Sequence, residues 1–542
     1  MNRENRLRGA DIVAQSLTRL GCRRVFTLSG NHIMSVFDAA LEAKLDLVHV
    51  RHEAAAVHMA DAWGRLTGVP GVALVTGGPG HANAVGALFT ALGAESPLVL
   101  LSGHAATWEL GRGGFQEIRQ AEMAAPVAKA SWTATAAATL GRDLAEAFRI
   151  ASSGRPGPVH LSLPSDLLDE HVGSNAVVWP EPAGQDRPIL SDADADAVLA
   201  AIAAAARPLI IAGPRLSSPP GRALLARLEA AAQTPAVIVE SPRGLADATL
   251  GAFPDLVRQV DLVVLLGKAL DFTIKWALPP AFDPAVRVIA IDPDQGLVER
   301  ARREKGERLL VGAVADTTVA AEQLASHAKP RAGTWLAEAR ALLDQRPEAW
   351  RTVTAQTAGR LHPAEVFRAL RPYIERRDDT ILICDGGEFA QWAQSMLPVR
   401  RRLINGVAGA IGASLPFALA ARLQDSEAPI IAILGDGTVG FHIAEFETAV
   451  RRGLPFVAVV GNDARWNAES QIQLRDYGRE RMHGCELLPS RYDRVVEALG
   501  GAGEYVDSAG ALADAVERAL ASGKPALINV MIESTAAPVI RR

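Results

Sequence analysis

Short apolar runs alternate with Ala-rich segments of helical length along most of the chain. Strands that form nearly continuous apolar runs are typical of parallel sheets, which helices cover on both faces. The alternation therefore predicts an α/β fold built on parallel sheets. In the first block the expected strands are Val25–Leu28, Leu45–Val50, Val72–Thr76, Leu98–Ser102 and Val159–Leu163.

The alternation falls into three blocks, so we expect three consecutive α/β domains. A chain of 542 residues exceeds the size at which one hydrophobic core keeps growing. Pro, Gly and Asp cluster in residues 179–192, and an Ala/Lys/Pro stretch at 325–334 ends the second block. The predicted domains are residues 1–178, 188–330 and 355–542. The later expected elements are strands Pro208–Ala212, Ala236–Glu240, Val260–Leu266, Val286–Ile291, Ile381–Cys384, Ile430–Leu434, Phe456–Val460 and Ala526–Ile532, and helices Arg222–Ala232 and Phe441–Arg452.

Composition and charge exclude several classes of protein. Apolar residues make up 49 % and charged residues 22 %, which is typical of a globular protein. The net charge of −5 comes without a Lys/Arg run, so we expect a small-molecule partner and no nucleic acid. Three cysteines far apart in sequence cannot form a disulfide framework or a zinc site. Residues 1–11 lack the apolar run of a secretory signal, and no stretch reaches about 18 apolar residues. We therefore expect a cytoplasmic protein with no membrane partner.

Acidic residues follow two expected strands of the third block. Gly435-Asp436-Gly437 comes after Ile430–Leu434, and Asn462-Asp463 comes after the next strand. Adjacent parallel strands lie about 4.8 Å apart, so carboxylates at their ends can share one cation. Mg²⁺ takes oxygen ligands and keeps phosphate oxygens in its shell. Glycines beside the acidic residue also let backbone N–H groups approach a phosphate. A lone Gly-Asp-Gly is a common turn, but the downstream Asn-Asp pair favours an Mg²⁺-diphosphate site.

This unit resembles the signature of thiamine-diphosphate enzymes, and the resemblance covers nearly all the chain. It implies that thiamine diphosphate and Mg²⁺ are the cofactors. The metal would be held by the side chains of Asp436 and Asp463 and the backbone carbonyl of Arg465. The sequence departs from the family at Asp463, where most relatives carry Asn, and a second carboxylate suggests a tighter dependence on metal. The other cofactor-binding residues that the resemblance implies on this side are Gly386, Gly387, Glu388, Gly409, Ile411, Gly435, Gly437 and Thr438.

The family also requires a Glu directly after a strand of the first domain, beside N1′ of the aminopyrimidine. Here Leu45–Val50 runs into Arg51-His52-Glu53, so Glu53 is the expected activating carboxylate. The alternative is that Glu53 only complements the helix N-terminus. Residues 72–80 and Asn83 match the family's pyrimidine-side loop, which makes Pro79 and Asn83 cofactor-binding candidates and favours the catalytic role. His52 is expected to be structural.

The resemblance implies an oligomer. Glu53 and Asp436 belong to different predicted domains, and in relatives these two domains come from different subunits. We therefore expect at least a homodimer, and a homotetramer is common in the family.

The loop after the first expected strand carries His32, in Thr27-Leu28-Ser29-Gly30-Asn31-His32. A His at this place resembles benzaldehyde lyase and the acetolactate-synthase-like branch of 2-hydroxyacyl-CoA lyases, which cleave α-hydroxy carbonyl compounds. Such cleavage requires a hydroxyl group to lose its proton, and a His with a pKa near 6.5 suits that transfer. The alternative is that His32 only forms hydrogen bonds within its loop. Gln116 falls where relatives place an amide that contacts cofactor-bound intermediates, although acetolactate synthases carry a similar Phe-Gln-Glu.

The middle domain offers a weaker indication of substrate. Residues 266–292 resemble oxalyl-CoA decarboxylases and 2-hydroxyacyl-CoA lyases, whose middle domain holds the CoA nucleotide. Basic residues such as Arg243, Lys268 and Lys275 stay unassigned. The leading hypothesis is a 2-hydroxyacyl-CoA lyase that reversibly joins formyl-CoA to an aldehyde or ketone. Acetolactate synthase or a benzaldehyde-lyase-type carboligase is the second hypothesis, and a non-catalytic homologue is the third.

Overall fold

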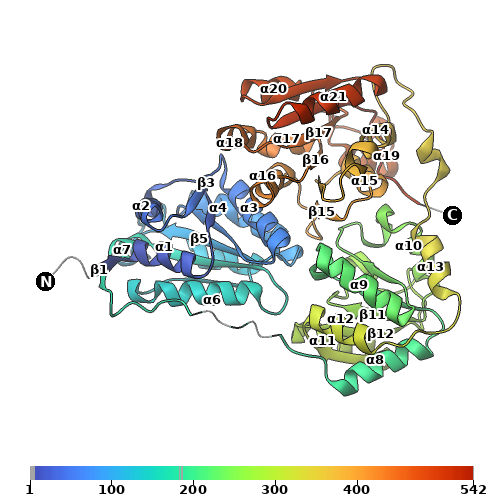
Figure 1. Cartoon of the computed structure of the whole chain (residues 1–542), viewed down its shortest axis with the longest axis horizontal. Coiled ribbons are helices and arrows are strands. Elements are labelled where there is room, and N and C mark those ends of the chain that lie inside the picture. The colour runs from blue at the N-terminus through green and yellow to red at the C-terminus, as the bar shows by residue number, and fades with distance from the viewer. Residues whose placement is uncertain (1–5, 182–183, 185–186, 541–542) are drawn as a thin grey trace. The chain divides into compact units, whose positions relative to one another are not determined.

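The computed structural model describes residues 6–181, 184 and 187–540. Residues 182–183 and 185–186 of the expected linker, and residues 1–5 of the charged N-terminus, lie outside this part of the chain. Two compact units are present. The first takes in the described residues up to 184 together with Leu415–Glu427 and His442–Leu454, and the second takes in the rest. Parallel sheets covered by helices are found in both, so the predicted α/β class is confirmed (Figure 1).

The first unit is built on a six-stranded parallel sheet in the order β3-β2-β4-β5-β7-β6. Helices α1, α2 and α6 pack on one face of this sheet and form a hydrophobic core with it. Helices α3 and α4 pack against each other and also contact strands of this sheet (Figure 1). The strands are β2 (Arg24–Thr27), β3 (Asp46–His49), β4 (Gly71–Val75), β5 (Leu98–His104), β6 (Ala130–Thr133) and β7 (Pro158–Pro164), and β1 (Arg6–Arg8) pairs with β8 (His171–Gly173). The helices are α1 (Gly9–Arg19), α2 (Met34–Glu42), α3 (Glu53–Thr67), α4 (Pro79–Gly93), α5 (Gln120–Ala124), α6 (Leu140–Ser152) and α7 (Ser165–Asp169).

Two segments that are distant in sequence complete the first unit. Arg24 donates a hydrogen bond to the Leu423 carbonyl at 2.9 Å, and the guanidinium of Arg452 lies 2.6 Å from Asp46. The buried carboxylate of Glu445 accepts a hydrogen bond from the Arg51 N–H at 2.8 Å. These segments contain α16 (Ser414–Gln424) and α18 (Glu445–Arg452). They come from the range that the sequence assigned to the third domain.

The second unit contains two parallel sheets. The middle sheet has the order β10-β9-β11-β12-β13, and α8, α9 and α12 form a core with one face of it. A larger core joins its other face to the third sheet. The middle strands are β9 (Pro208–Ala212), β10 (Ala236–Ile238), β11 (Leu262–Leu266), β12 (Arg287–Asp292) and β13 (Leu309–Val314). The helices are α8 (Asp192–Ala204), α9 (Pro219–Ala232), α10 (Phe253–Val257), α11 (Gln295–Lys305), α12 (Thr317–His327) and α13 (Trp335–Leu343).

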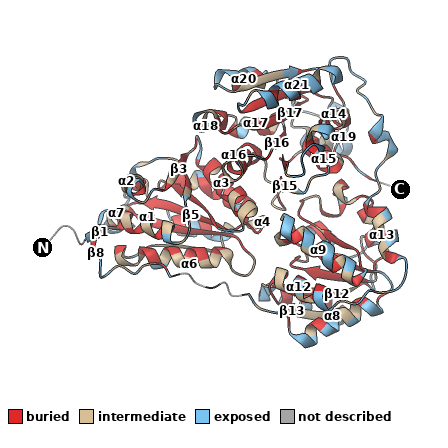
Figure 2. Cartoon of the chain, in the orientation of Figure 1, coloured by how far each residue is buried: buried red, intermediate tan, exposed pale blue. Residues whose placement is uncertain are grey.

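The third sheet has six parallel strands in the order β15-β14-β16-β17-β19-β18. Its central strands are buried along their length, whereas the outer faces of α20 and α21 are exposed (Figure 2). The strands are β14 (Ile381–Cys384), β15 (Arg401–Ile404), β16 (Ile430–Gly435), β17 (Val457–Asn462), β18 (Ala502–Val506) and β19 (Ala526–Met531). The helices of the second unit here are α14 (Pro363–Glu375), α15 (Glu388–Met396), α17 (Asp436–His442), α19 (Asn467–Asp476), α20 (Tyr492–Ala498) and α21 (Ala509–Ala521).

Two details of the predicted elements need correction. The expected helix Phe441–Arg452 is wrong, because α17 begins at Asp436 and ends at His442, and α18 follows as a separate helix. The strands β6, β13, β15 and β18 were not expected. All four lie at sheet edges. Strands β6, β15 and β18 mix polar with apolar residues, so they lack the continuous apolar run of a central strand, whereas β13 is an apolar run, LLVGAV, that was not recognised. No helix in the described residues is long and apolar enough to cross a membrane.

Candidate active site

Two acidic side chains leave neighbouring strands at the carboxyl edge of the third sheet. Strands β16 and β17 pair in parallel, with Gly435 opposite Gly461. Asp436 and Asp463 follow these strands and are buried. Oδ2 of Asp436 accepts a hydrogen bond from the Arg465 N–H at 3.2 Å. In contrast, Oδ2 of Asp463 has no hydrogen-bond partner among the described residues. The pair is therefore incompletely satisfied by the protein.

The electrostatics of this pair favour a cation. Burial raises the pKa of both carboxyl groups, and the charge of Asp436 raises the pKa of Asp463 further. The repulsion between these two buried carboxylates is relieved only if one of them takes up a proton or if a positive ion binds between them. Carboxylate and carbonyl oxygens are the ligands that Mg²⁺ takes, and it usually keeps phosphate oxygens as well. The residues present therefore fit a magnesium-bound diphosphate.

A cavity of about 190 Å³ opens beside this pair. It is formed by loops at the carboxyl ends of β14, β16 and β17, where ligands bind in open α/β sheets. Every residue that the sequence predicted on this side of the cofactor lines it, namely Gly386, Gly387, Glu388, Gly409, Ile411, Gly435, Asp436, Gly437, Thr438, Asp463 and Arg465.

Aromatic rings explain why two positions of the cavity are glycine. A Cβ on Gly437 would lie 2.7 Å from the ring of Trp466, and a Cβ on Gly461 would lie 2.5 Å from the ring of Phe389. Any side chain there would have to displace a ring. Thr438 closes the adjacent turn, because its hydroxyl donates to the Gly435 carbonyl at 3.0 Å and accepts from the Gly435 N–H at 3.1 Å.

Asp385 holds together the loops on the other side of the cavity. Its buried carboxylate accepts hydrogen bonds from the N–H groups of Gly386 at 2.7 Å and Gly412 at 2.9 Å. A Cβ on Gly386 would lie 2.6 Å from Ile411, so the two loops approach closely. Glu388 begins α15, and its carboxylate accepts from Arg243 at 2.7 Å and from the Ala537 N–H. The charge of the Glu388 carboxylate is thus balanced within the protein by Arg243.

Glu53 lies at the carboxyl edge of the first unit's sheet. It is the first residue of α3 and is 8 % exposed. Its Oε2 accepts a hydrogen bond from the Asn83 side chain at 3.0 Å. A Cβ on Gly80 would lie 3.4 Å from Oε1, so this glycine leaves space beside the carboxylate. Pro79 begins α4. Neighbouring His52 caps α3, because its Nδ1 accepts a hydrogen bond from the Ala54 N–H at 3.1 Å.

His32 lies at the same edge of the first unit, in the turn after β2. It is 6 % exposed, and its Nδ1 is 3.1 Å from the Thr76 hydroxyl. Its ring stacks on Phe115 with centroids 5.9 Å apart. Burial lowers the pKa of His32 below the usual value. The ring is therefore neutral at neutral pH and can accept a proton.

Gln116 and Gln120 shape the glycine loop that precedes α4. Gln116 has a positive φ of 57°. A Cβ on Gly78 would lie 2.4 Å from the Gln116 carbonyl oxygen. Gln120 was not expected from the sequence. Its buried amide accepts from the Gly78 N–H at 2.9 Å and donates to the Gly103 carbonyl at 3.1 Å. It therefore ties this loop to the end of β5.

Comparison with known proteins decides the family. The model of the thiamine pyrophosphate enzyme N-terminal TPP binding domain matches residues 7–123. The C-terminal TPP binding domain model matches residues 385–530. A probable acetolactate synthase of Mycobacterium bovis is 31 % identical, over 97 % of this chain and 96 % of its own length. The chain belongs to the thiamine pyrophosphate enzyme family.

Further relatives carry two different activities in their names. The 2-hydroxyacyl-CoA lyase 2 of Bos taurus is 29 % identical over 97 % of this enzyme and 90 % of its own length. A catabolic acetolactate synthase of Raoultella terrigena is also 29 % identical, over 98 % of this enzyme and 96 % of its own length. The enzyme is thus thiamine-diphosphate-dependent and of the acetolactate synthase or 2-hydroxyacyl-CoA lyase type.

Several residues that organise the two edges of the enzyme were not among the site residues predicted from the sequence. Gln120, Thr76 and Trp466 act by contacts with residues 29 to 44 positions away. Gln120 lies in a five-residue helix outside any motif. Its only sequence indication is its place shortly after the Phe115-Gln116 pair.

Proposed function

We propose that this enzyme is a thiamine-diphosphate- and Mg²⁺-dependent carbon–carbon lyase of the 2-hydroxyacyl-CoA lyase type, which reversibly condenses formyl-CoA with an aldehyde or ketone. The observation that carries the proposal is the buried His32, placed beside Thr76 and Phe115 at the same sheet edge as Glu53. A lyase of this kind needs a base for a hydroxyl proton, and a neutral buried imidazole meets that need.

The cofactor would be held by groups already described. Asp436, Asp463 and the Arg465 carbonyl would bind Mg²⁺, while Gly437 and Thr438 would contact the diphosphate. Bound thiamine diphosphate supplies a carbon nucleophile that attacks a carbonyl group. Glu53 would keep its carboxyl group beside the aminopyrimidine, since Asn83 fixes its orientation. Pro79 and Asn83 would lie on the pyrimidine side.

His32 and Gln116 would act on the substrate. With a lowered pKa, His32 can take the proton of a substrate 2-hydroxyl group, which allows the aldehyde or ketone to leave. Thr76 orients the ring through its Nδ1. Gln116 would donate from its side-chain amide to substrate oxygens.

The CoA part of the proposed substrate has less support. Lys268 is buried and pairs with Asp271, and Arg243 pairs with Glu388. These two cations are therefore engaged within the protein, and neither is assigned to a CoA phosphate. A nucleotide site in the middle domain stays a prediction from the resemblance.

The second candidate is an acetolactate synthase or a benzaldehyde-lyase-type carboligase. The 31 % identity to a probable acetolactate synthase favours it. A non-catalytic homologue is a third alternative, which requires that the chain has lost cofactor binding. Detection of bound thiamine diphosphate in purified protein would exclude it.

We further propose that the enzyme is cytoplasmic and at least a homodimer, with a homotetramer expected. Native mass measurement tests the oligomeric state.

One chromatographic assay separates the first two candidates. The enzyme with thiamine diphosphate and Mg²⁺ is incubated with a 2-hydroxyacyl-CoA and, separately, with pyruvate. We expect formyl-CoA and an aldehyde from the thioester. A Glu53→Gln protein serves as the control for cofactor-dependent turnover. Acetolactate from pyruvate, with no formyl-CoA from any thioester tried, would replace the lyase by the second candidate.

A further inference from the structure

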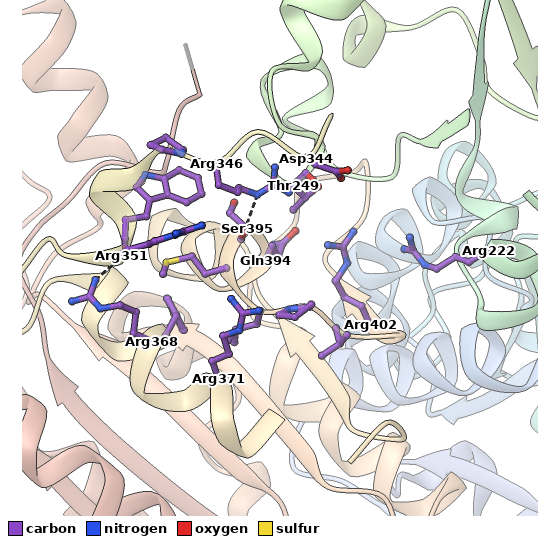
Figure 3. Close-up of a pocket in the computed structure, with 17 residues that line it drawn as sticks. Arg222, Thr249, Asp344, Arg346, Arg351, Arg368, Arg371, Gln394, Ser395 and Arg402 are labelled. Atoms are coloured by element: carbon purple, nitrogen blue, oxygen red, sulfur yellow. Dashed lines mark hydrogen bonds between the residues drawn. The ribbon is translucent and has the colours of Figure 1, made fainter. Parts of the chain in front are cut away.

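A second cavity lies in the second unit, apart from the candidate active site. Its volume is about 810 Å³, compared with about 190 Å³ for the cavity beside Asp436. Ligand pockets for small organic molecules usually measure about 300–1,000 Å³. The cavity is bounded by α14, the end of α15, the start of β15 and residues 344–351 (Figure 3).

The topology separates this cavity from the candidate active site. Helix α15 begins at Glu388, which lines the cavity of the carboxyl edge, and ends at Met396, which lines the second cavity. A nine-residue helix spans about 13 Å. The loop from Leu397 to Arg400 then leads into β15. The second cavity therefore lies at the amino end of β15 in the third sheet, opposite the carboxyl edge that holds the candidate active site. Ligands of the carboxyl edge do not occupy it.

The lining of the second cavity is strongly cationic. It contains six arginines and one acidic residue, Asp344. Figure 3 shows arginine side chains from several elements surrounding one space, with the amide of Gln394 between them. The arginines are Arg222, Arg346, Arg351, Arg368, Arg371 and Arg402.

The carboxylates that pair with these arginines are fewer than the arginines. Glu240 accepts from both Arg222 and Arg402, each at 2.6 Å. Burial would raise its pKa, but the two arginines lower it to about 2. One carboxylate thus serves two guanidinium groups. A positive excess remains around this part of the cavity.

Two further arginines donate to neutral acceptors. Arg368 donates to the backbone carbonyls of Trp350 at 2.9 Å and Val353 at 2.6 Å. Arg346 donates to the Thr249 carbonyl at 2.8 Å and the Leu343 carbonyl at 3.0 Å. Neither has an ion pair with a carboxylate among the described residues. Backbone carbonyls fix the position of these guanidinium groups without cancelling their charge.

Gln394 supplies an independent observation. Its side chain is 5 % exposed, and neither its amide nitrogen nor its amide oxygen has a hydrogen-bond partner in the described part of the chain. Nε of Arg402 in the same lining also lacks a partner. A buried polar group without a hydrogen-bond partner costs free energy, because it has lost its bonds to water. Bound ligand atoms would remove this cost.

The lining also has an apolar side. Trp350 and Phe367 are buried in the wall, and Leu397 and Val399 continue it towards β15. A simple inorganic ion would make no favourable contact with this apolar side of the lining. Guanidinium groups match phosphate and carboxylate oxygens by paired hydrogen bonds. The lining is therefore complementary to a molecule with both oxyanion groups and an apolar body.

We propose that this arginine-lined cavity binds a small organic anion that carries at least two phosphate or carboxylate charges on an apolar body. Arg371 and Arg351, both exposed, lie at its entrance, and Gln394 lies in its wall. The site is distinct from the candidate active site, and its occupancy does not depend on the substrate of the reaction.

Titration calorimetry on the full-length protein tests the proposal. The protein is first saturated with thiamine diphosphate and Mg²⁺, and each probe solution carries the same concentration of free Mg²⁺, so that the probes neither enter the carboxyl edge nor draw off its metal. The probes are ADP for an organic phosphate, citrate for a polycarboxylate and inorganic phosphate for the bare ion. We expect at least one organic probe to bind with a Kd below about 1 mM and inorganic phosphate to bind at least about tenfold more weakly.

Two variants and a matched control locate the binding. Arg371 is exposed and pairs with Glu375 four residues away, a surface contact that contributes little to stability, so Arg371→Glu should leave the fold intact. We expect it to weaken the organic probe at least about tenfold. Gln394→Leu removes no hydrogen bond to any residue that the structure describes, and it should also weaken binding. The control is Arg376→Glu, which makes the same charge change at an arginine that pairs with Glu517 outside the cavity.

The outcomes decide the proposal in either direction. Loss of affinity in Arg371→Glu with unchanged affinity in Arg376→Glu supports it, and the organic probe that binds identifies the anion class. Absence of binding by both organic probes would overturn it. Equal losses in the two charge variants, or inorganic phosphate binding as tightly as the organic probes, would also overturn it.

Discussion

The carboxyl edges of the two units differ in how far the protein itself satisfies their functional groups. In the first unit, Glu53 has Asn83 as a partner and His32 has Thr76. In the second unit, Asp436 and Asp463 lie close together and Oδ2 of Asp463 has no partner among the described residues. The first edge is therefore organised in advance by side chains, while the second depends on a cation and a ligand. The difference predicts that substitutions at the first edge affect rate, and that ligands of the second edge affect stability.

The largest effect is expected at Glu53. Glu53→Gln keeps an oxygen that can accept from Asn83 but removes the acid, so turnover should fall by about a thousandfold while the fold is retained. Steady-state kcat and the melting temperature measure the two effects. Glu42→Gln, an exposed glutamate of α2 in the same unit, is the control and should be unchanged. Full activity of Glu53→Gln would remove Glu53 from the site.

His32→Ala should slow carbon–carbon cleavage by at least about a hundredfold, the low end for the loss of a general acid–base. Thiamine diphosphate should still bind, because His32 is not among the predicted cofactor-binding residues. Burial lowers the pKa of His32, so the neutral form persists below pH 6.5 and the rate should fall only at lower pH, as the ring gains a proton. A pH–rate profile measures this limb, with His171→Ala as the exposed control. Unchanged cleavage would leave His32 as a loop hydrogen-bonding residue.

Ligands of the second edge should stabilise the protein. Mg²⁺ with thiamine diphosphate at about a hundred times its Kd should add about 2.7 kcal/mol to the free energy of unfolding. Asp463→Asn removes one of two buried like charges, so it should raise the melting temperature of the cofactor-free protein and reduce the gain from Mg²⁺. Thermal melts with and without Mg²⁺ measure both effects, and Asp476→Asn in the exposed part of α19 is the control. Equal Mg²⁺ gains in wild type and Asp463→Asn would contradict the tighter dependence on metal that the second carboxylate predicts.

A smaller effect is expected from the buried His81 of the first unit. Burial lowers its pKa to about 4, while its Nδ1 lies 2.9 Å from the Ser102 hydroxyl and its ring lies 4.5 Å from that of His160. The unfolded chain takes up a proton near pH 6.5 that folded His81 does not, so stability is full above that pH and falls below it. From pH 6.5 to 5.5 one such His costs about 1 kcal/mol.

Thermal melts from pH 7.5 to 5.5 measure this slope. His81→Gln should flatten the pH dependence relative to the wild type, and His327→Gln at an exposed position of α12 should not. An identical slope in His81→Gln would show that this histidine does not set the acid sensitivity of the first unit.

The central strands and the cofactor motifs could be predicted from sequence because each is local. A buried parallel strand is a continuous apolar run, so β4, β11 and β16 are readable without knowledge of their neighbours. The edge strands β15 and β18 were missed because burial on one side leaves a mixed pattern. The residues around Asp436 were also readable, since the Gly-Asp-Gly and Asn-Asp spacing lies within one strand-helix-strand unit.

Only the tertiary structure decided which polar groups have partners. Gln394 and Arg402 are ordinary polar residues in sequence, yet the fold places them in one lining with arginines from α9 and α14. Likewise, Glu445 contacts Arg51 across 394 positions and joins a segment of the third predicted domain to the first unit. Sequence patterns report periodicity over a few residues, whereas the pairing of charges and the burial of amides depend on groups that folding brings together. The sequence therefore determined the α/β class and the cofactor motifs, and the tertiary structure determined the incomplete metal pair and the arginine-lined cavity.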